Sequence, residues 1–407
     1  MSRVWPFLSL LLIVLAFIVG LIVGSSGESE ASANYYEKAA EQYQLALQVD
    51  TPPAGSDEPE RWEKAIALYR SVFDNYPDSE YADNALFAIA SRIDYKKQPD
   101  IALTLYRRLI NDYPDSEHAP PALNAVGVAH FHREDYDRAM YMFDQFLEAY
   151  PTSPLRNEAM LNRAVCLMKK GKFDESRAEL EKLADAADFE HAAQFYTAMV
   201  HYEQQAFPDA RKHFGNVIDS GNPDFAAEAQ FNIAQSYFSE RAYEDAIASY
   251  EETIQNYPDS ASAVDSAFQI GWSYERIKEY QAAVDALKTA IEAHPNSRNT
   301  PSAQVFMAKI HSEALDQPEE AVDAYRAIVN ETIPLAAAET EDRAIYDIRR
   351  NAQYQIAHIF EEEGDSRAIE EYKTMLEMFP EPHAAPEHKS NEIDETYIHD
   401  LRLKLSE

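Results

Sequence analysis

The chain has 407 residues, and its 36 Lys and Arg against 71 Asp and Glu give a formal net charge of -35. A surface of that sign repels the phosphate backbone of nucleic acids, which argues against a nucleic-acid partner. Solubility, cationic partners and a salty medium that screens the self-repulsion are three alternative explanations of the acidity. The single cysteine, Cys166, excludes an intrachain disulfide and a multi-cysteine metal site.

The first element is an uncharged apolar stretch from Val4 to Val23. At about 1.5 Å per residue it spans the roughly 30 Å hydrocarbon core of a bilayer, which predicts a transmembrane helix. A cleaved signal peptide is the alternative, although its apolar region usually has only about 7 to 15 residues. Arg3 precedes the stretch and acidic residues follow it, so the body of the protein is predicted to lie outside the cytoplasm. Residues 1–27 are therefore predicted to form a membrane anchor (or signal peptide) and a linker.

A four-residue motif then recurs along the chain. Tyr-Pro-Asp-Ser occurs at 76–79, 113–116 and 257–260, with looser copies at 150–153 and 294–297. In the copies at 76, 113 and 150 the prolines lie 37 residues apart. Proline stops a helix, and the Asp and Ser that follow are expected to cap the next one. Such a period is typical of a solenoid of repeated units.

Small residues recur in the same period. A small residue is followed four positions later by an aromatic residue or leucine, as in Ala139 and Phe143 or Ala283 and Leu287. A second small residue recurs upstream, for example at Gly127. These positions predict close contact between the two helices of a hairpin.

The offsets resemble those of the tetratricopeptide repeat, whose units carry small residues, an aromatic and a terminal proline at matching positions. Within that family, the Tyr-Pro-Asp-Ser ending is similar to bacterial envelope proteins of the BamD, YbgF and YfgM kind. The resemblance covers about residues 34–380 and implies an all-α fold, an α-solenoid of about nine helical hairpins in a right-handed superhelix. With the N-terminal transmembrane helix, it implies a single-pass protein of the bacterial inner membrane, with its repeats in the periplasm or otherwise extracytoplasmic.

Three places depart from the regular pattern. The fourth unit ends in Ala184–Asp188 without a proline, so we expect the solenoid to change pitch there. Residues 335–350 have a helical pattern that predicts an elongated penultimate helix. Residues 381–407 are predicted to form a linker and a C-terminal capping helix, because Ile393, Tyr397, Leu401 and Leu405 share one helical face. A detachable, partner-binding helix is the alternative.

Residues with catalytic or metal-binding chemistry do not form a recognisable site. His130 and His132 straddle a helix end and a turn, so they do not converge on a metal. His130, His201 and His311 share one repeat position, which favours a packing role, and Cys166 lies in an apolar run typical of a buried structural thiol. No phosphate-binding loop, dinucleotide fingerprint or nucleophile elbow occurs. We therefore predict no enzymatic activity, no catalytic or metal-binding residues, no cofactor and no small-molecule substrate.

The first helices of successive hairpins are expected to line a concave wall, and from the third to the seventh unit their side chains are apolar or aromatic. The predicted protein-binding residues are Phe131, Leu161, Met168, Phe195, Met199, Tyr202, Phe231, Phe238, Phe268 and Trp272. Aromatic and methionine side chains exposed in a groove commonly bind peptides or helices. The alternative is that they pack between adjacent hairpins.

Together these features predict a membrane-anchored, extracytoplasmic scaffold or adaptor that binds protein or peptide partners of an envelope complex through this groove. The alternative is a translocon-associated periplasmic chaperone that holds unfolded clients. An adaptor is expected to bind one stoichiometric partner, whereas such a chaperone contacts many emerging chains.

Overall fold

The computed structural model describes residues 30–51, 59–93, 98–186, 188–330 and 339–379. These residues contain eighteen α-helices and no strand, as the all-α prediction requires. The helices of the first half are α2 (Glu30–Asp50), α3 (Pro59–Asn75), α4 (Ala82–Arg92), α5 (Pro99–Asp112), α6 (Ala119–His132), α7 (Tyr136–Ala149), α8 (Arg156–Lys169) and α9 (Phe173–Leu183). Those of the second half are α10 (Glu190–Glu203), α11 (Phe207–Asp219), α12 (Pro223–Ser239), α13 (Tyr243–Asn256), α14 (Ala261–Arg276), α15 (Tyr280–Ala293), α16 (Thr300–Glu313), α17 (Pro318–Asn330), α18 (Glu339–Glu362) and α19 (Arg367–Met378).

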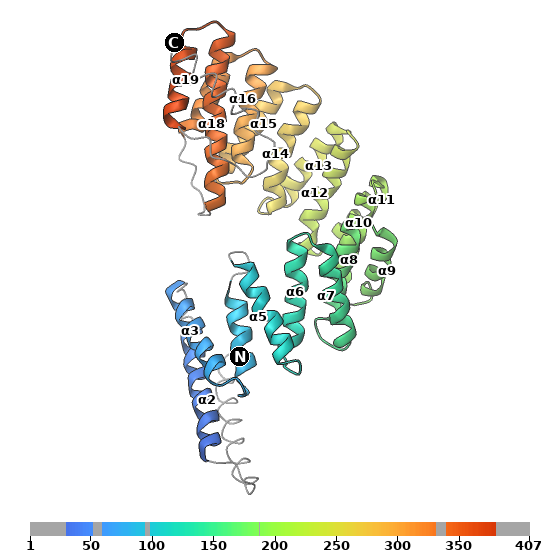
Figure 1. The fold of residues 1–407 in the computed structure, drawn as a ribbon. Helices are drawn as coiled ribbons and strands as arrows, with labels where there is room; N and C mark the ends of the chain where they lie inside the picture. Colours follow the sequence, from blue (N-terminus) through green and yellow to red (C-terminus); the bar gives the residue numbers. More distant parts are fainter. Residues whose placement is uncertain (1–29, 52–58, 94–97, 187, 331–338, 380–407) are drawn as a thin grey trace. The chain divides into compact units, whose positions relative to one another are not determined.

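The described helices pair into nine hairpins, from α2 with α3 to α18 with α19, which confirms the predicted number. They belong to two compact units, Met1–Asp185 and Ala186–Glu407. Within each unit every helix packs against the helices before and after it in the chain, so that consecutive hairpins lie side by side (Figure 1). The boundary between the units falls within Ala184–Asp188, where the proline of the motif is missing.

The prediction of a fold with an N-terminal transmembrane helix is corrected. Among the described helices none combines the length and the apolar character that crossing a bilayer requires. The longest, α18, carries acidic and basic residues along its length, and charged side chains are costly inside a membrane. The predicted span, Val4–Val23, lies outside the described residues. The predicted localisation, a single-pass inner-membrane protein with extracytoplasmic repeats, depended on that helix and is corrected with it.

The predicted contacts between paired helices are confirmed by burial. The small residues of the second helices are buried in all nine hairpins; they are Ala65, Ala102, Ala139, Ser176, Ala210, Ala246, Ala283, Ala321 and Ala368. A Cβ atom placed on Gly127 would lie 2.6 Å from Cε1 of Phe143, and one on Gly271 would lie 2.4 Å from Cγ of Leu287. Glycine at these positions therefore lets the two helices of a hairpin approach closely.

The Tyr-Pro-Asp-Ser motif ends one helix and supports the next. The Ser260 hydroxyl caps α14 by accepting a hydrogen bond from the Ala263 amide at 3.0 Å. The Tyr113 hydroxyl donates to the Pro77 carbonyl at 2.9 Å and so links consecutive copies of the motif. Where the motif is absent, the Asn222 side chain caps α12 instead. The expected role in stopping helices is confirmed, because α5, α7, α13 and α15 end at the Tyr or His of a copy. The expected capping is confirmed at Ser260 alone among the copies and is wrong for the others, since α4, α6, α8 and α16 have no side-chain cap.

The ends of the chain bear on the domain prediction. The elongated penultimate helix is confirmed as α18, with 24 residues. The anchor and linker at 1–27 and the linker and capping helix at 381–407 lie outside the described residues, so that division of the chain stays a prediction.

Candidate protein-binding surfaces

The ten residues predicted to bind a partner all lie on first helices of hairpins. Phe131 of α6 and Leu161 and Met168 of α8 belong to the unit Met1–Asp185. The other seven lie on α10, α12 and α14 of the unit Ala186–Glu407. The prediction that these residues lie on first helices is therefore confirmed.

Three of the ten side chains are core residues. Met168 and Phe195 are 3% exposed and Phe268 is 0% exposed. The Phe195 ring packs against the ring of Phe214 on α11, with centroids 5.6 Å apart, and Phe268 packs in a cluster with Leu287. The burial of all three agrees with the packing alternative, and Phe195 and Phe268 contact the second helix of their hairpin.

The other seven side chains are half-buried, and several rest on an aromatic ring or a hydroxyl of the same unit. The Phe231 ring lies 5.7 Å from the ring of Tyr250, and the Phe238 ring meets Tyr243 edge-on at 5.3 Å. The Tyr202 hydroxyl lies 2.9 Å from the Ser239 hydroxyl. A ring held in place on one side and open on the other loses little conformational entropy when it binds a partner.

Five of the half-buried residues belong to three consecutive first helices of one unit. They are Met199 and Tyr202 of α10, Phe231 and Phe238 of α12, and Trp272 of α14, and we call them the first-helix row. The buried Tyr250 ring packs against Phe231 of this row, and its hydroxyl donates to Oε1 of Gln235 on the same helix α12 at 2.5 Å. Burial raises the pKa of the Tyr250 phenol, which keeps it a neutral hydrogen-bond donor.

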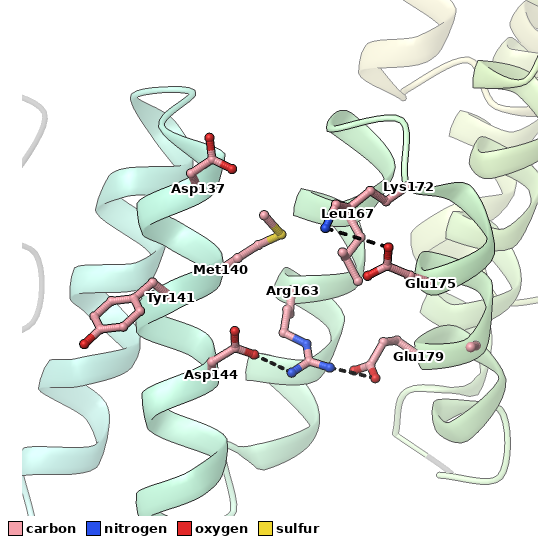
Figure 2. Close-up of a pocket in the computed structure, with 10 residues that line it drawn as sticks. Asp137, Met140, Tyr141, Asp144, Arg163, Leu167, Lys172, Glu175 and Glu179 are labelled. Carbon is pink, nitrogen blue, oxygen red and sulfur yellow. Dashed lines mark hydrogen bonds and ion pairs between the residues drawn. The ribbon is translucent and has the colours of Figure 1, made fainter.

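A groove between α7 and α9 was missed by the sequence prediction. This α7–α9 groove has a volume of about 470 Å³, and its floor is formed by α8. Figure 2 shows Arg163 reaching across it from α8. Nη1 of Arg163 lies 2.5 Å from Oδ1 of Asp144 on α7, and Nη2 lies 2.8 Å from Oε1 of Glu179 on α9. The guanidinium therefore joins the two walls of the groove.

A second groove of the same kind lies between α13 and α15. This α13–α15 groove has a volume of about 540 Å³, with α14 as its floor, and it contains none of the ten predicted residues. Ile254, Ile270 and several alanines make it mainly apolar. The carboxyl groups of Glu251 on α13 and Asp285 on α15 stand on its opposite walls.

The two grooves could have been found in the sequence by comparing the numbers of acidic and basic residues in different repeats. Residues 136–182 contain eight basic and eight acidic side chains, whereas residues 243–293 contain three basic and ten acidic ones. The second helices α7, α9, α13 and α15, which form the walls of the two grooves, lie within these two ranges apart from the last residue of α9. The charge of the chain is therefore distributed unevenly between its repeats.

The histidines at the shared repeat position make different contacts. His130 is buried, and its Nε2 lies 3.0 Å from Nη2 of Arg107. Because a guanidinium only donates, Nε2 accepts, and burial followed by the charge of Arg107 lowers the pKa of His130. His201 stacks on the ring of His213 at 4.8 Å. Each histidine is thus held by neighbouring side chains, as the predicted packing role expects.

Cys166 is fully buried, and burial raises the pKa of its thiol to about 12. The predicted buried thiol is confirmed, because a thiol with such a pKa is protonated at neutral pH and is a poor nucleophile. Among the residues that the structure describes, no three His, Cys, Asp or Glu side chains are grouped so that they could hold a metal ion.

Comparison with known proteins identifies the repeat. Three family models described as tetratricopeptide repeats match the chain, the first at residues 94–154 and 195–261, the second at 130–199, and the third at 55–79 and 265–297. No curated protein matches the sequence.

Solved structures are similar in fold at low sequence identity. Yeast Tom70 matches with a TM-score of 0.52 and 15% identity over 82% of this chain and 66% of its own. A signal-transduction ATPase with a tetratricopeptide repeat sensor from Pyrococcus horikoshii matches with a TM-score of 0.47 and 15% identity. That match covers 89% of this chain and 55% of the ATPase, so the chain spans about half the length of that relative. At this identity, the Tom70 match is a likeness of fold alone.

Proposed function

The chain is a tetratricopeptide repeat protein, and from this premise we propose that it is a non-catalytic adaptor whose first-helix row holds a peptide or helix of a protein partner. The repeat fold itself supports a general role in protein interaction. The observation that carries the finer proposal is the first-helix row, five half-buried apolar or aromatic side chains from three consecutive first helices. Half-buried aromatic side chains supported from below are typical anchors for a bound segment.

The partner segment is expected to combine apolar residues with basic flanks. Apolar side chains match the rings of Phe231, Phe238 and Trp272. Basic flanks match the net charge of -35, which raises the local concentration of cationic segments and speeds their association. Salt is expected to weaken this electrostatic contribution while leaving the apolar contacts in place.

Photo-crosslinking in intact cells tests the proposal. A photoreactive amino acid replaces Phe231 or Phe238 in the full chain, and in the control it replaces Lys212, an exposed residue of the second helix α11. We expect one dominant protein adduct from the two row positions and none from the control. Equal labelling at all three positions, or no adduct at all, would overturn the role of the row. Adducts with many unrelated emerging chains would instead indicate the alternative function of a chaperone.

A matched variant tests the same row by binding. Phe231→Gln combined with Phe238→Gln is expected to abolish capture of the crosslinked partner while the helical circular dichroism is retained. Tyr196→Phe, on the first helix α10 outside the row, is the control and is expected to bind as the parent does. Undiminished capture by the double variant would contradict the proposal.

A further inference from the structure

The α7–α9 groove and the α13–α15 groove are built from equivalent repeat positions. Each position is counted from the small residue that anchors its helix: Ala139, Ala164 and Ser176 for the first groove, and Ala246, Gly271 and Ala283 for the second. By this count Asp144 is equivalent to Glu251, Arg163 to Ile270, and Glu179 to Ala286. The two grooves therefore differ at known positions of one shared architecture.

In the α7–α9 groove the chain supplies its own cation. The Arg163 guanidinium lies within 2.8 Å of carboxylates on both walls, and the Glu179 side chain beneath it is only 8% exposed. Lys182 adds a second cation, with Nζ 3.1 Å from Oε1 of Glu179. Each wall carboxylate of this groove thus has a partner within the same unit.

In the α13–α15 groove the acid on the first wall is kept and the cation is lost. Glu251 keeps the carboxylate, while apolar Ile270 stands where the first groove has Arg163. Over residues 188–330, neither Glu251 nor Asp285 has an ion-pair partner; Asp285 accepts one side-chain hydrogen bond, from Nε2 of Gln281 at 3.0 Å. The site therefore presents two carboxylates to a charge that the chain itself does not provide.

The rest of the α13–α15 groove suits apolar side chains. Ala286 replaces the long side chain of Glu179, so the groove is wider at this point. Ile254 and Ile270 form an apolar surface, and the volume of about 540 Å³ is within the range of protein ligand sites. An apolar surface flanked by carboxylates is complementary to an amphipathic helix whose apolar face carries one basic residue.

We propose that the α13–α15 groove is a second docking site, which takes an amphipathic helix of a partner protein and pairs an Arg or Lys of that helix with Glu251 and Asp285. The partner's cation then has the role that Arg163 has in the α7–α9 groove. The site is separate from the first-helix row, because its two walls are second helices. It goes beyond the function proposed above and does not depend on it.

The test introduces the ion-pair bridge of the α7–α9 groove into the α13–α15 groove. The double variant Ile270→Arg, Ala286→Glu introduces the bridge of the α7–α9 groove and leaves the net charge unchanged, so non-specific attraction of basic peptides stays the same. A displayed library of 15-residue amphipathic helices, with one position of the apolar face randomised, is selected on the full chain and counter-selected on this variant. We expect enrichment of Arg or Lys at the randomised position, and at least about tenfold weaker binding of the selected peptides to the variant.

Single substitutions provide a readout that does not depend on packing. Glu251→Gln and Asp285→Asn preserve the shape of the groove, and each is expected to weaken a selected Arg peptide severalfold while leaving its citrulline analogue unaffected. The Phe231→Gln, Phe238→Gln variant is expected to bind the peptides normally, which separates this site from the first-helix row.

Three results would overturn the proposal. The first is a selection that yields no peptide with a higher affinity for the parent chain than for the Ile270→Arg, Ala286→Glu variant. The second is enrichment of apolar or acidic residues at the randomised position. The third is self-association of the parent chain in analytical ultracentrifugation that the Ile270→Arg, Ala286→Glu variant abolishes. The groove would then bind a second copy of the chain.

Discussion

The α7–α9 and α13–α15 grooves have the same helical framework and different surfaces. Each has second helices as walls and a first helix as floor, yet Arg163 joins the walls of one groove by ion pairs, and Ile270 leaves the other apolar. The difference teaches that the repeat conserves its packing positions while the groove positions vary from one hairpin to the next. Buried positions are constrained by close packing, whereas groove positions only have to satisfy their own charges.

The largest expected effect concerns what the two grooves share. Leu180 under the α7–α9 groove and Leu287 under the α13–α15 groove are equivalent, and they are 1% and 0% exposed. Either Leu→Ala substitution is expected to lower the free energy of unfolding by about 2–5 kcal/mol, because it removes a buried side chain and leaves a cavity. Urea denaturation followed by circular dichroism measures it. A large loss at one position and none at the other would show that the two frameworks are not equivalent.

An intermediate effect is expected where the two grooves differ. Arg163→Met keeps most of the side-chain volume but removes the cation between Asp144 and Glu179. We expect a loss of about 1–3 kcal/mol in the free energy of unfolding, since the mostly buried Glu179 carboxylate keeps Lys182 as its one ion-pair partner among the described residues. Ile270→Met, the equivalent control, is expected to cost about 1 kcal/mol or less. Equal losses from both variants in urea denaturation would argue against the role of the bridge.

The smallest expected effect lies in the turns at the ends of these grooves. Gly171 between α8 and α9 has φ of 73°, and the equivalent Lys278 between α14 and α15 has φ of 65°. This left-handed conformation is strained for a residue with a Cβ atom, so Lys278→Gly is expected to raise the free energy of unfolding by about 0.5–1 kcal/mol. Gly171→Ala is expected to lower it by a similar amount. Thermal melts of both variants check the opposite signs, and shifts of the same sign would contradict the explanation.

Much of the fold could be predicted from the sequence, and less of the candidate sites. The spacing of the small residues predicted the close contact of the two helices at Ala139 and at Gly271 and Leu287, because contacts within a hairpin are set by short spacings along the chain. The same repeat positions predicted that Phe195 and Phe268 are exposed on the concave wall, but in the structure both are buried in the core. A first helix has neighbours on several sides, and a repeat position alone does not say which neighbour covers a given side chain.

What the sequence determined by itself is the hairpin: where each helix stops, which small residues meet, and how often the unit repeats. These features depend on proline, on capping side chains and on residues a few turns apart, all of which act locally. What only the tertiary structure decided is which side chains remain open to a partner. The Arg163 bridge joins three helices and pairs the carboxylates of one groove, while Glu251 and Asp285 line a groove without an Arg or Lys. Exposure and charge pairing depend on side chains brought together from different hairpins.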